Sequence, residues 1–146
     1  MGTLSACGIS SVEYIQFMID GSPLNFNNPP DSITCHSNTL SQPPAAYGFK
    51  TIISAMESAP NPQNWTLFDF YHNGVTGTYP ITGFGVATPA TAGVSYTIVG
   101  SPVMNITEMG LVNIGFISGN CNVQLRRSAP LNYTQNITCT FRVRRR

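Results

Sequence analysis

The chain has 146 residues, of which only 9% are charged, and its formal net charge at pH 7 is +1. This length fits one domain with a sizeable core, and recurring apolar strands at near-zero net charge exclude a disordered chain. All the arginines lie between positions 126 and 146, and basic residues are not spread over a face, which argues against a nucleic-acid-binding protein.

The first eleven residues are interpreted as a tether. Residues 4–8, Leu-Ser-Ala-Cys-Gly, match the lipobox, where a bacterial lipoprotein signal peptide is cleaved before the cysteine that carries lipid. We therefore expect Cys7 to be lipidated; the alternative is an ordinary cysteine in an accidental match. No apolar run approaches the length of a membrane span, so we expect contact with a membrane only through this lipid.

Residues 12–146 are predicted to form one all-β domain, an antiparallel β-sandwich of about eight or nine short strands. A hairpin opens the domain, with Val12–Ile19 running into the turn Asp20-Gly21. Its return arm, Ser22–Asn27, contains a proline, which is typical of an edge strand. Further strands are predicted over Ser32–Ser37, Tyr47–Met56, Trp65–His72, Ser95–Val99 and Val103–Glu108.

Aromatic residues occur on both faces of the predicted strand Trp65–His72. Trp65 and Tyr71, together with Tyr79 farther along the chain, are candidates to face a ligand, because aromatic rings stack against sugars. Strand alternation requires some of the aromatic rings in this region to lie in the core instead.

The stretch Asn73–Ala92 is rich in Gly, Thr and Pro and shows no sustained alternation. We expect it to form a long, exposed and mobile loop that takes part in binding a glycan or a protein. Its Gly83-Phe84-Gly85 run lacks the strand, helix and downstream acid that accompany a nucleotide-binding loop.

The last two predicted strands, Phe116–Leu125 and Asn136–Arg144, define an antiparallel register. If Cys121 lies opposite Cys139, inward residues of one strand face inward residues of the other, and the outward Asn, Ser and Thr residues pair as well. Opposed Cα atoms lie about 4.5–5.5 Å apart, within reach of a disulfide. We expect a disulfide between the two cysteines in an oxidising compartment and adjacent thiols in a reducing one, with Cys35 left as a buried thiol.

Candidate catalytic and metal-binding residues are few. Cys35 and His36 are neighbours in a strand and therefore point to opposite faces, so one metal ion would meet only one of them. Asp69 and His72 are expected to form a solvated pair near a strand end, and no nucleophile elbow occurs. We therefore expect a protein without enzymatic activity, metal or cofactor.

Three segments carry motifs: Tyr14–Phe26 (YIQFMIDGSPLNF), Val103–Gly119 (VMNITEMGLVNIGFISG) and Ile137–Arg145 (ITCTFRVRR). They are similar, in the same order, to the opening hairpin, the central segment and the closing strand of small β-sandwich surface lipoproteins of Bacteroidota, a family of unknown function. Cys121 and Cys139 depart from the family, which usually has Phe and Gly at these positions. The resemblance implies a β-sandwich in the cell envelope and supplies no active site.

These observations leave three hypotheses open. The first is a non-enzymatic surface lipoprotein of the bacterial cell envelope, anchored through Cys7, that binds a glycan or protein through Asn73–Ala92. The second is a phage virion surface protein, such as a capsid decoration protein or a fibre domain. The third is an accessory module of a carbohydrate-active enzyme. Low charge and strands rich in Thr, Asn and Gly suit the first two alike.

Overall fold

The computed structural model describes residues 12–40, 47–58, 63–88, 95–127 and 132–146. Cys7 and its lipobox lie outside the described residues. The described chain forms strands and no helix. In order, the strands are β1 Glu13–Ile19, β2 Ser22–Asn28, β3 Ser32–Thr39, β4 Phe49–Met56, β5 Trp65–His72, β6 Gly77–Ala87, β7 Thr97–Ile98, β8 Val103–Met109, β9 Phe116–Arg127 and β10 Tyr133–Arg144.

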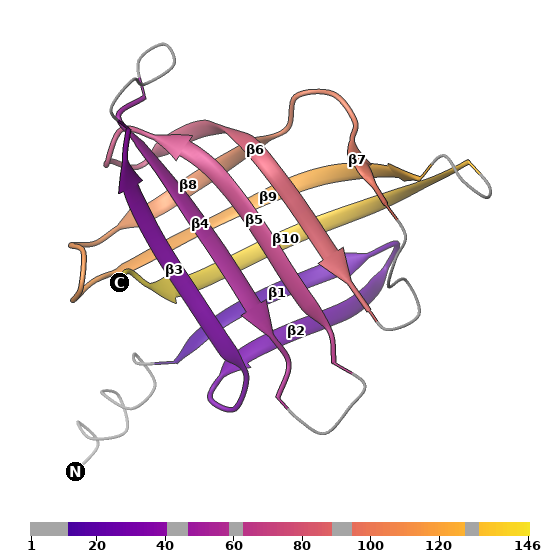
Figure 1. The fold of residues 1–146 in the computed structure, drawn as a ribbon, viewed down its shortest axis with the longest axis horizontal. Helices are drawn as coiled ribbons and strands as arrows, with labels where there is room; N and C mark the ends of the chain where they lie inside the picture. The colour runs from indigo at the N-terminus through magenta and orange to yellow at the C-terminus, as the bar shows by residue number, and fades with distance from the viewer. Residues whose placement is uncertain (1–11, 41–46, 59–62, 89–94, 128–131) are drawn as a thin grey trace.

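The strands form one antiparallel sheet in the order β2-β1-β10-β9-β8-β6-β5-β4-β3, and β7 adds a short pairing with β9. Figure 1 shows β3, β4, β5 and β6 as one layer crossing over a second layer of β8, β9, β10, β1 and β2. Because β6 pairs with both β5 and β8, the two layers belong to one nearly closed sheet. The all-β antiparallel prediction is confirmed, and the described residues form ten strands where about eight or nine were expected.

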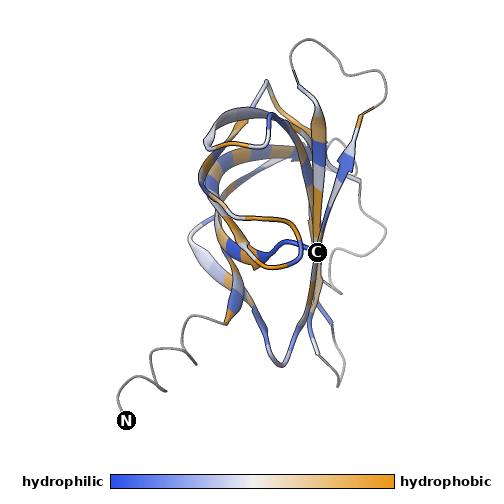
Figure 2. Cartoon of the chain, turned by 90° about the vertical axis from the view of Figure 1, so that its left-hand side faces the viewer, coloured by the Kyte–Doolittle hydropathy of each residue, from blue (hydrophilic) through white to orange (hydrophobic). Residues whose placement is uncertain are grey.

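Aromatic and branched side chains fill the space between the layers. Figure 2 shows apolar and polar residues alternating along the strands, so that each strand buries one face. Phe17 lies at the centre, with ring centroids 6.2 Å from Phe26 and 6.4 Å from Phe68, both in edge-to-face geometry. Burial of each such ring contributes about 1.5–3 kcal/mol, so this cluster is a main source of stability.

The hairpin between β9 and β10 has the predicted register. Cys121 lies opposite Cys139, and Phe141 lies opposite Gly119. A Cβ on Gly119 would lie 2.6 Å from the Asn105 carbonyl oxygen and 3.0 Å from the Phe141 ring. Glycine is therefore required here because the Phe141 ring and the backbone of β8 occupy the space of a side chain.

The predicted disulfide is not formed, since Cys35, Cys121 and Cys139 are all free thiols. Burial, together with a hydrogen bond to Cys121, raises the pKa of Cys139 well above its ordinary value. Burial raises the pKa of Cys35 to about 12. Because the thiolate is the species that reacts in disulfide exchange, these buried cysteines are held in the unreactive form. The prediction that Cys35 is a buried free thiol is confirmed.

The opening hairpin is also as predicted. Ile19 lies opposite Ser22, so Asp20 and Gly21 form a two-residue turn, with φ of 50° and 86°. This left-handed backbone suits Asp-Gly and matches the twist of the two strands. The return strand β2, which contains Pro23, lies at one edge of the sheet.

The prediction of a long exposed loop over Asn73–Ala92 was wrong. Strand β6, Gly77–Ala87, occupies its centre and pairs with β5 on one side and β8 on the other. Its register against β5 shifts at Asp69/Phe70, and such an irregularity breaks the alternation that marks a strand in the sequence. The predicted strand Ser95–Val99 is reduced to the two residues of β7.

Candidate ligand-binding surface

The outer face of β5 carries two of the three aromatic residues that the sequence singled out. Trp65, Leu67, Asp69 and Tyr71 alternate with buried residues, so their side chains share this face. Trp65 is 44% exposed and Leu67 42%. Since a strand rises about 3.3 Å per residue, Trp65 and Tyr71 mark the ends of a line about 20 Å long. We call these four side chains the β5 track.

At the Trp65 end the track borders a shallow depression of about 190 Å³. Met56, which lies opposite Trp65 on β4, is 49% exposed and adds an apolar wall. The hydroxyl groups of Thr34 and Ser54 also line this depression and hydrogen-bond each other at 2.6 Å. An apolar platform next to hydroxyl donors and acceptors matches the two kinds of surface that a sugar ring presents.

At the other end Tyr71 stacks on Tyr47, with ring centroids 6.1 Å apart and an interplanar angle of 8°. The Lys50 ammonium lies 5.9 Å from the centroid of the Tyr71 ring and 3.8 Å from the Asp69 carboxylate. Thr82 donates a hydrogen bond to the same carboxylate. The track therefore ends in an ordered aromatic pair beside charged groups that can bond hydroxyls.

Tyr79 does not belong to this surface. It is only 4% exposed, and its hydroxyl donates a 2.6 Å hydrogen bond to the Val75 carbonyl. The ring packs edge-on against Tyr47 at 6.0 Å. The prediction that Tyr79 faces a ligand was wrong, because Tyr79 sits on the inward phase of a strand that the sequence analysis treated as a loop.

His72 is fully buried and does not form a solvated pair with Asp69. The Gly74 N–H donates to His72 Nδ1 at 3.0 Å, and Nε2 lies 2.7 Å from the Thr51 hydroxyl. Since Nδ1 accepts, the ring is neutral and Nε2–H donates to Thr51. Burial, aided by the positive charge of Arg145, lowers the pKa of His72 to about 4.

The hydrogen-bonded chain continues beyond Thr51. Its hydroxyl lies 2.7 Å from that of Ser37, which in turn accepts a 3.3 Å hydrogen bond from Arg145 Nη2. This buried chain joins β5, β4 and β3 to the residue that follows β10. It links the edge strand β3 to the end of β10, and His72 at its inner end is shielded from solvent.

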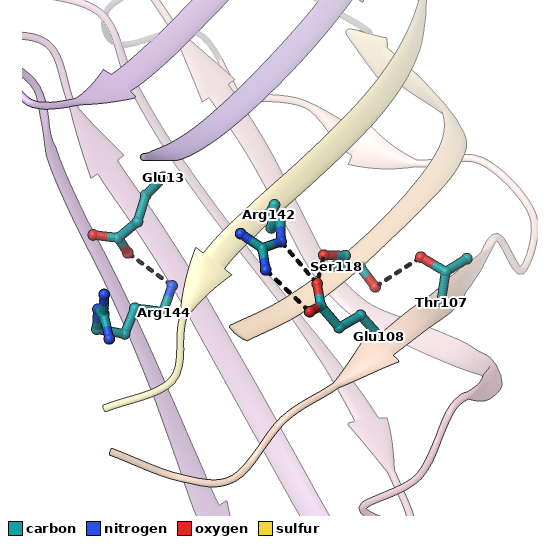
Figure 3. A network of polar contacts seen from close by, with 6 residues as sticks. All are labelled: Glu13, Thr107, Glu108, Ser118, Arg142 and Arg144. Atoms are coloured by element: carbon teal, nitrogen blue, oxygen red, sulfur yellow. Dashed lines mark hydrogen bonds and ion pairs between the residues drawn. The ribbon is translucent and has the colours of Figure 1, made fainter. Parts of the chain in front are cut away.

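Two carboxylates near the C-terminal end bind arginines (Figure 3). Glu108 takes two hydrogen bonds from Arg142, at 2.9 and 3.1 Å, and the bond from this guanidinium lowers the Glu108 pKa. Glu13 is buried, which alone would raise its pKa. Bonds from Arg146 and from the Arg144 N–H outweigh burial and lower it. Both carboxylates therefore bond arginines at the end of the chain and serve to hold the fold together.

A second depression, of about 800 Å³, lies on the outer face of β1, β10 and β9. Four of its nine lining residues are uncharged and polar, and two of these, Asn122 and Thr138, lie opposite each other in the predicted register. Met18, Val123 and Ile137 add apolar surface. None of the residues that line it is aromatic. It combines apolar side chains with amide and hydroxyl groups but has no aromatic stacking surface, and the sequence analysis did not single it out.

Within the described ranges, no group of three or more His, Cys, Asp and Glu side chains could hold a metal ion. Cys35 is buried and His36 exposed, as expected for neighbours in a strand. Among the described residues, no helix has the length and apolar character needed to cross a membrane. The chain matches no protein-family model, no curated protein and no solved structure.

Proposed function

We propose that the chain is a non-enzymatic binding module that holds an oligosaccharide along the β5 track. The observation that carries the proposal is the placement of Trp65 and Tyr71 on one exposed strand face, with Leu67 and Asp69 between them. Indole and phenol rings pack against the C–H faces of sugars, while Asp69 and nearby hydroxyls bond the ring substituents. A line of about 20 Å suits a chain of sugars better than a single ring.

A glycan array with the purified chain tests this function. Trp65→Ala and Tyr71→Ala should each weaken a positive signal about tenfold, since loss of one stacking contact removes about 0.5–1.5 kcal/mol beyond the buried area. Tyr133→Ala is the matched control, because Tyr133 is 41% exposed on β10, outside the track. Binding that survives both track variants, or no binding to any glycan, contradicts the proposal.

For location we propose the bacterial cell envelope, with Cys7 as the lipid anchor. Metabolic labelling with palmitate tests this in cells that express the natural gene, and Cys7→Ser should abolish the label. A protein that carries no lipid and copurifies with phage particles would instead be a virion surface protein.

One observation favours the virion alternative. A row of uncharged polar residues crosses six strands on the face opposite the β5 track, and all of its members are exposed. The row consists of Asn25, Gln16, Thr140, Asn120, Asn105 and Thr78. Such a face, without charge repulsion, suits packing of many identical copies.

A further inference from the structure

The turn between β8 and β9, residues 110–115, exposes three large aliphatic side chains. Leu111 is 70% exposed, Ile114 67% and Val112 47%. Leu111 and Ile114 are the most exposed large apolar residues in the described part of the chain. We call the three side chains the apolar tip. A cluster of this kind, displayed together, marks an interaction site, whereas single exposed residues do not.

The backbone under the apolar tip is tightly bonded. Gly110 N–H donates to the Phe116 carbonyl and Gly115 N–H to the Leu111 carbonyl, both at 2.7 Å. A Cβ on Gly115 would lie 2.5 Å from the Leu111 nitrogen, so the turn closes only with glycine. Arg145 donates a 2.6 Å bond to the Gly110 carbonyl. The tip is therefore ordered before any partner binds, which reduces the entropy cost of binding.

Positive charge surrounds the tip. Phe116, directly after the turn, has the guanidinium of Arg142 3.9 Å and that of Arg144 4.9 Å from its ring centroid. Arg142 is paired with Glu108. Within the described residues, Arg144 and Arg145 form no ion pair with a carboxylate, so this end carries a net positive charge. Arg145 is only 7% exposed, so Arg144 is the one of the two that can meet a ligand.

We propose that the apolar tip and its arginines dock on an anionic lipid bilayer. The turn forms one end of the molecule, beside the C-terminal end of the chain (Figure 1). Aliphatic side chains on a projecting turn can enter the boundary between headgroups and acyl chains while the Arg144 guanidinium meets a lipid phosphate. The positive charge beside the tip complements an anionic membrane surface. An apolar groove on a protein partner would bind the aliphatic side chains without needing that charge.

The start of β1 lies at the same end, since Glu13 accepts a 2.8 Å hydrogen bond from the Arg144 N–H. Glu13 follows Cys7, the residue proposed above to carry lipid, by six positions. The tip does not depend on that lipid. It would supply the second contact that one acyl chain needs for stable anchoring.

Flotation with lipid vesicles tests the proposal on the purified chain without lipid. We expect binding to vesicles of phosphatidylcholine mixed with phosphatidylglycerol, weaker binding to phosphatidylcholine alone, and loss of the difference in high salt. The double variant Leu111→Ser/Ile114→Ser should weaken binding about tenfold. Arg144→Gln should weaken it about fivefold on the mixed vesicles only.

Val103→Ser is the matched control, because Val103 is 44% exposed at the other end of β8. Unchanged melting temperatures show that the variants are folded. No binding to either vesicle, or equal binding by wild type and double variant, overturns the proposal. A double variant that retains its glycan signal shows that the two proposed sites are separate.

Discussion

Lowering the pH from 7 to 5 should destabilise the fold through His72. Its pKa is about 4 in the folded chain and 6.5 in the unfolded chain, so the unfolded state binds more protons between these values. The stabilising contribution is complete above pH 6.5 and is lost as the pH falls toward 4. At pH 5 the protonation difference corresponds to about 2 kcal/mol, which is a large share of the stability of a small domain.

The structural reason is that a charged ring would lose the hydrogen bond from Gly74. Protonation of Nδ1 converts this atom from an acceptor into a donor and places a charge near Arg145 in a buried site. The pKa values of Glu13 and Glu108 are lowered from 4.5, so the stability that these acids contribute is present above that pH and is lost mainly below it. They therefore add little to the change between pH 7 and 5.

Urea unfolding at pH 5, 6 and 7, followed by circular dichroism, measures the effect. In His72→Gln the difference in unfolding free energy between pH 7 and 5 should shrink by about 2 kcal/mol. His36→Gln, at the other, exposed histidine, should keep the wild-type dependence. Ring resonances in NMR give a direct check should His72→Gln not fold. A His72 titration midpoint near 6.5 refutes the reasoning. So does a His72→Gln variant whose unfolding free energy changes with pH as much as that of the wild type.

Gly119→Ala should cost about 1–3 kcal/mol of unfolding free energy, because the added methyl meets the Asn105 carbonyl and the Phe141 ring. Gly85→Ala, whose nearest contact would be 3.8 Å, should be nearly neutral in the same thermal melts, and equal costs would contradict the argument. Glu13→Gln should lower the unfolding free energy by about 1–3 kcal/mol, because it weakens the bonds of a buried carboxylate to Arg144 and Arg146. Glu108→Gln should cost under about 1 kcal/mol, because the Glu108 side chain is 40% exposed. A larger loss at Glu108 in urea titrations would reverse that ranking. Peptide mapping of the folded chain without reduction should find Cys121 and Cys139 as free thiols, because burial keeps the Cys139 thiol protonated and slow to react. A bridge from Cys35 to either cysteine would disagree with the register.

The sequence was most informative where two strands constrain each other. The alternation in β9 and β10 allowed a register with Cys121 opposite Cys139, and the structure has that register. The Asp20-Gly21 turn was equally local, since two residues with positive φ suffice to reverse the chain. Trp65 and Tyr71 could be placed on an exposed face of β5 for the same reason, by period-2 alternation.

His72 carried a signal that was not used. It follows Phe68 and Phe70 in the inward phase of β5, which predicts burial and not a solvated pair with Asp69. The Leu111–Ile114 turn likewise lies between two glycines, but nothing local shows that its apolar side chains stay outside the core.

Strand identity and the inward face of each strand were thus determined largely by the sequence, because alternation is a property of neighbouring residues. Only the tertiary structure decided that β6 joins the two layers, because its pairing with β5 and β8 compensates for its glycines and proline. It also decided that Arg145 reaches Gly110 on the β8–β9 turn and Ser37 on β3. These contacts connect residues 35 and 108 positions apart, and no local pattern specifies a partner at such separation.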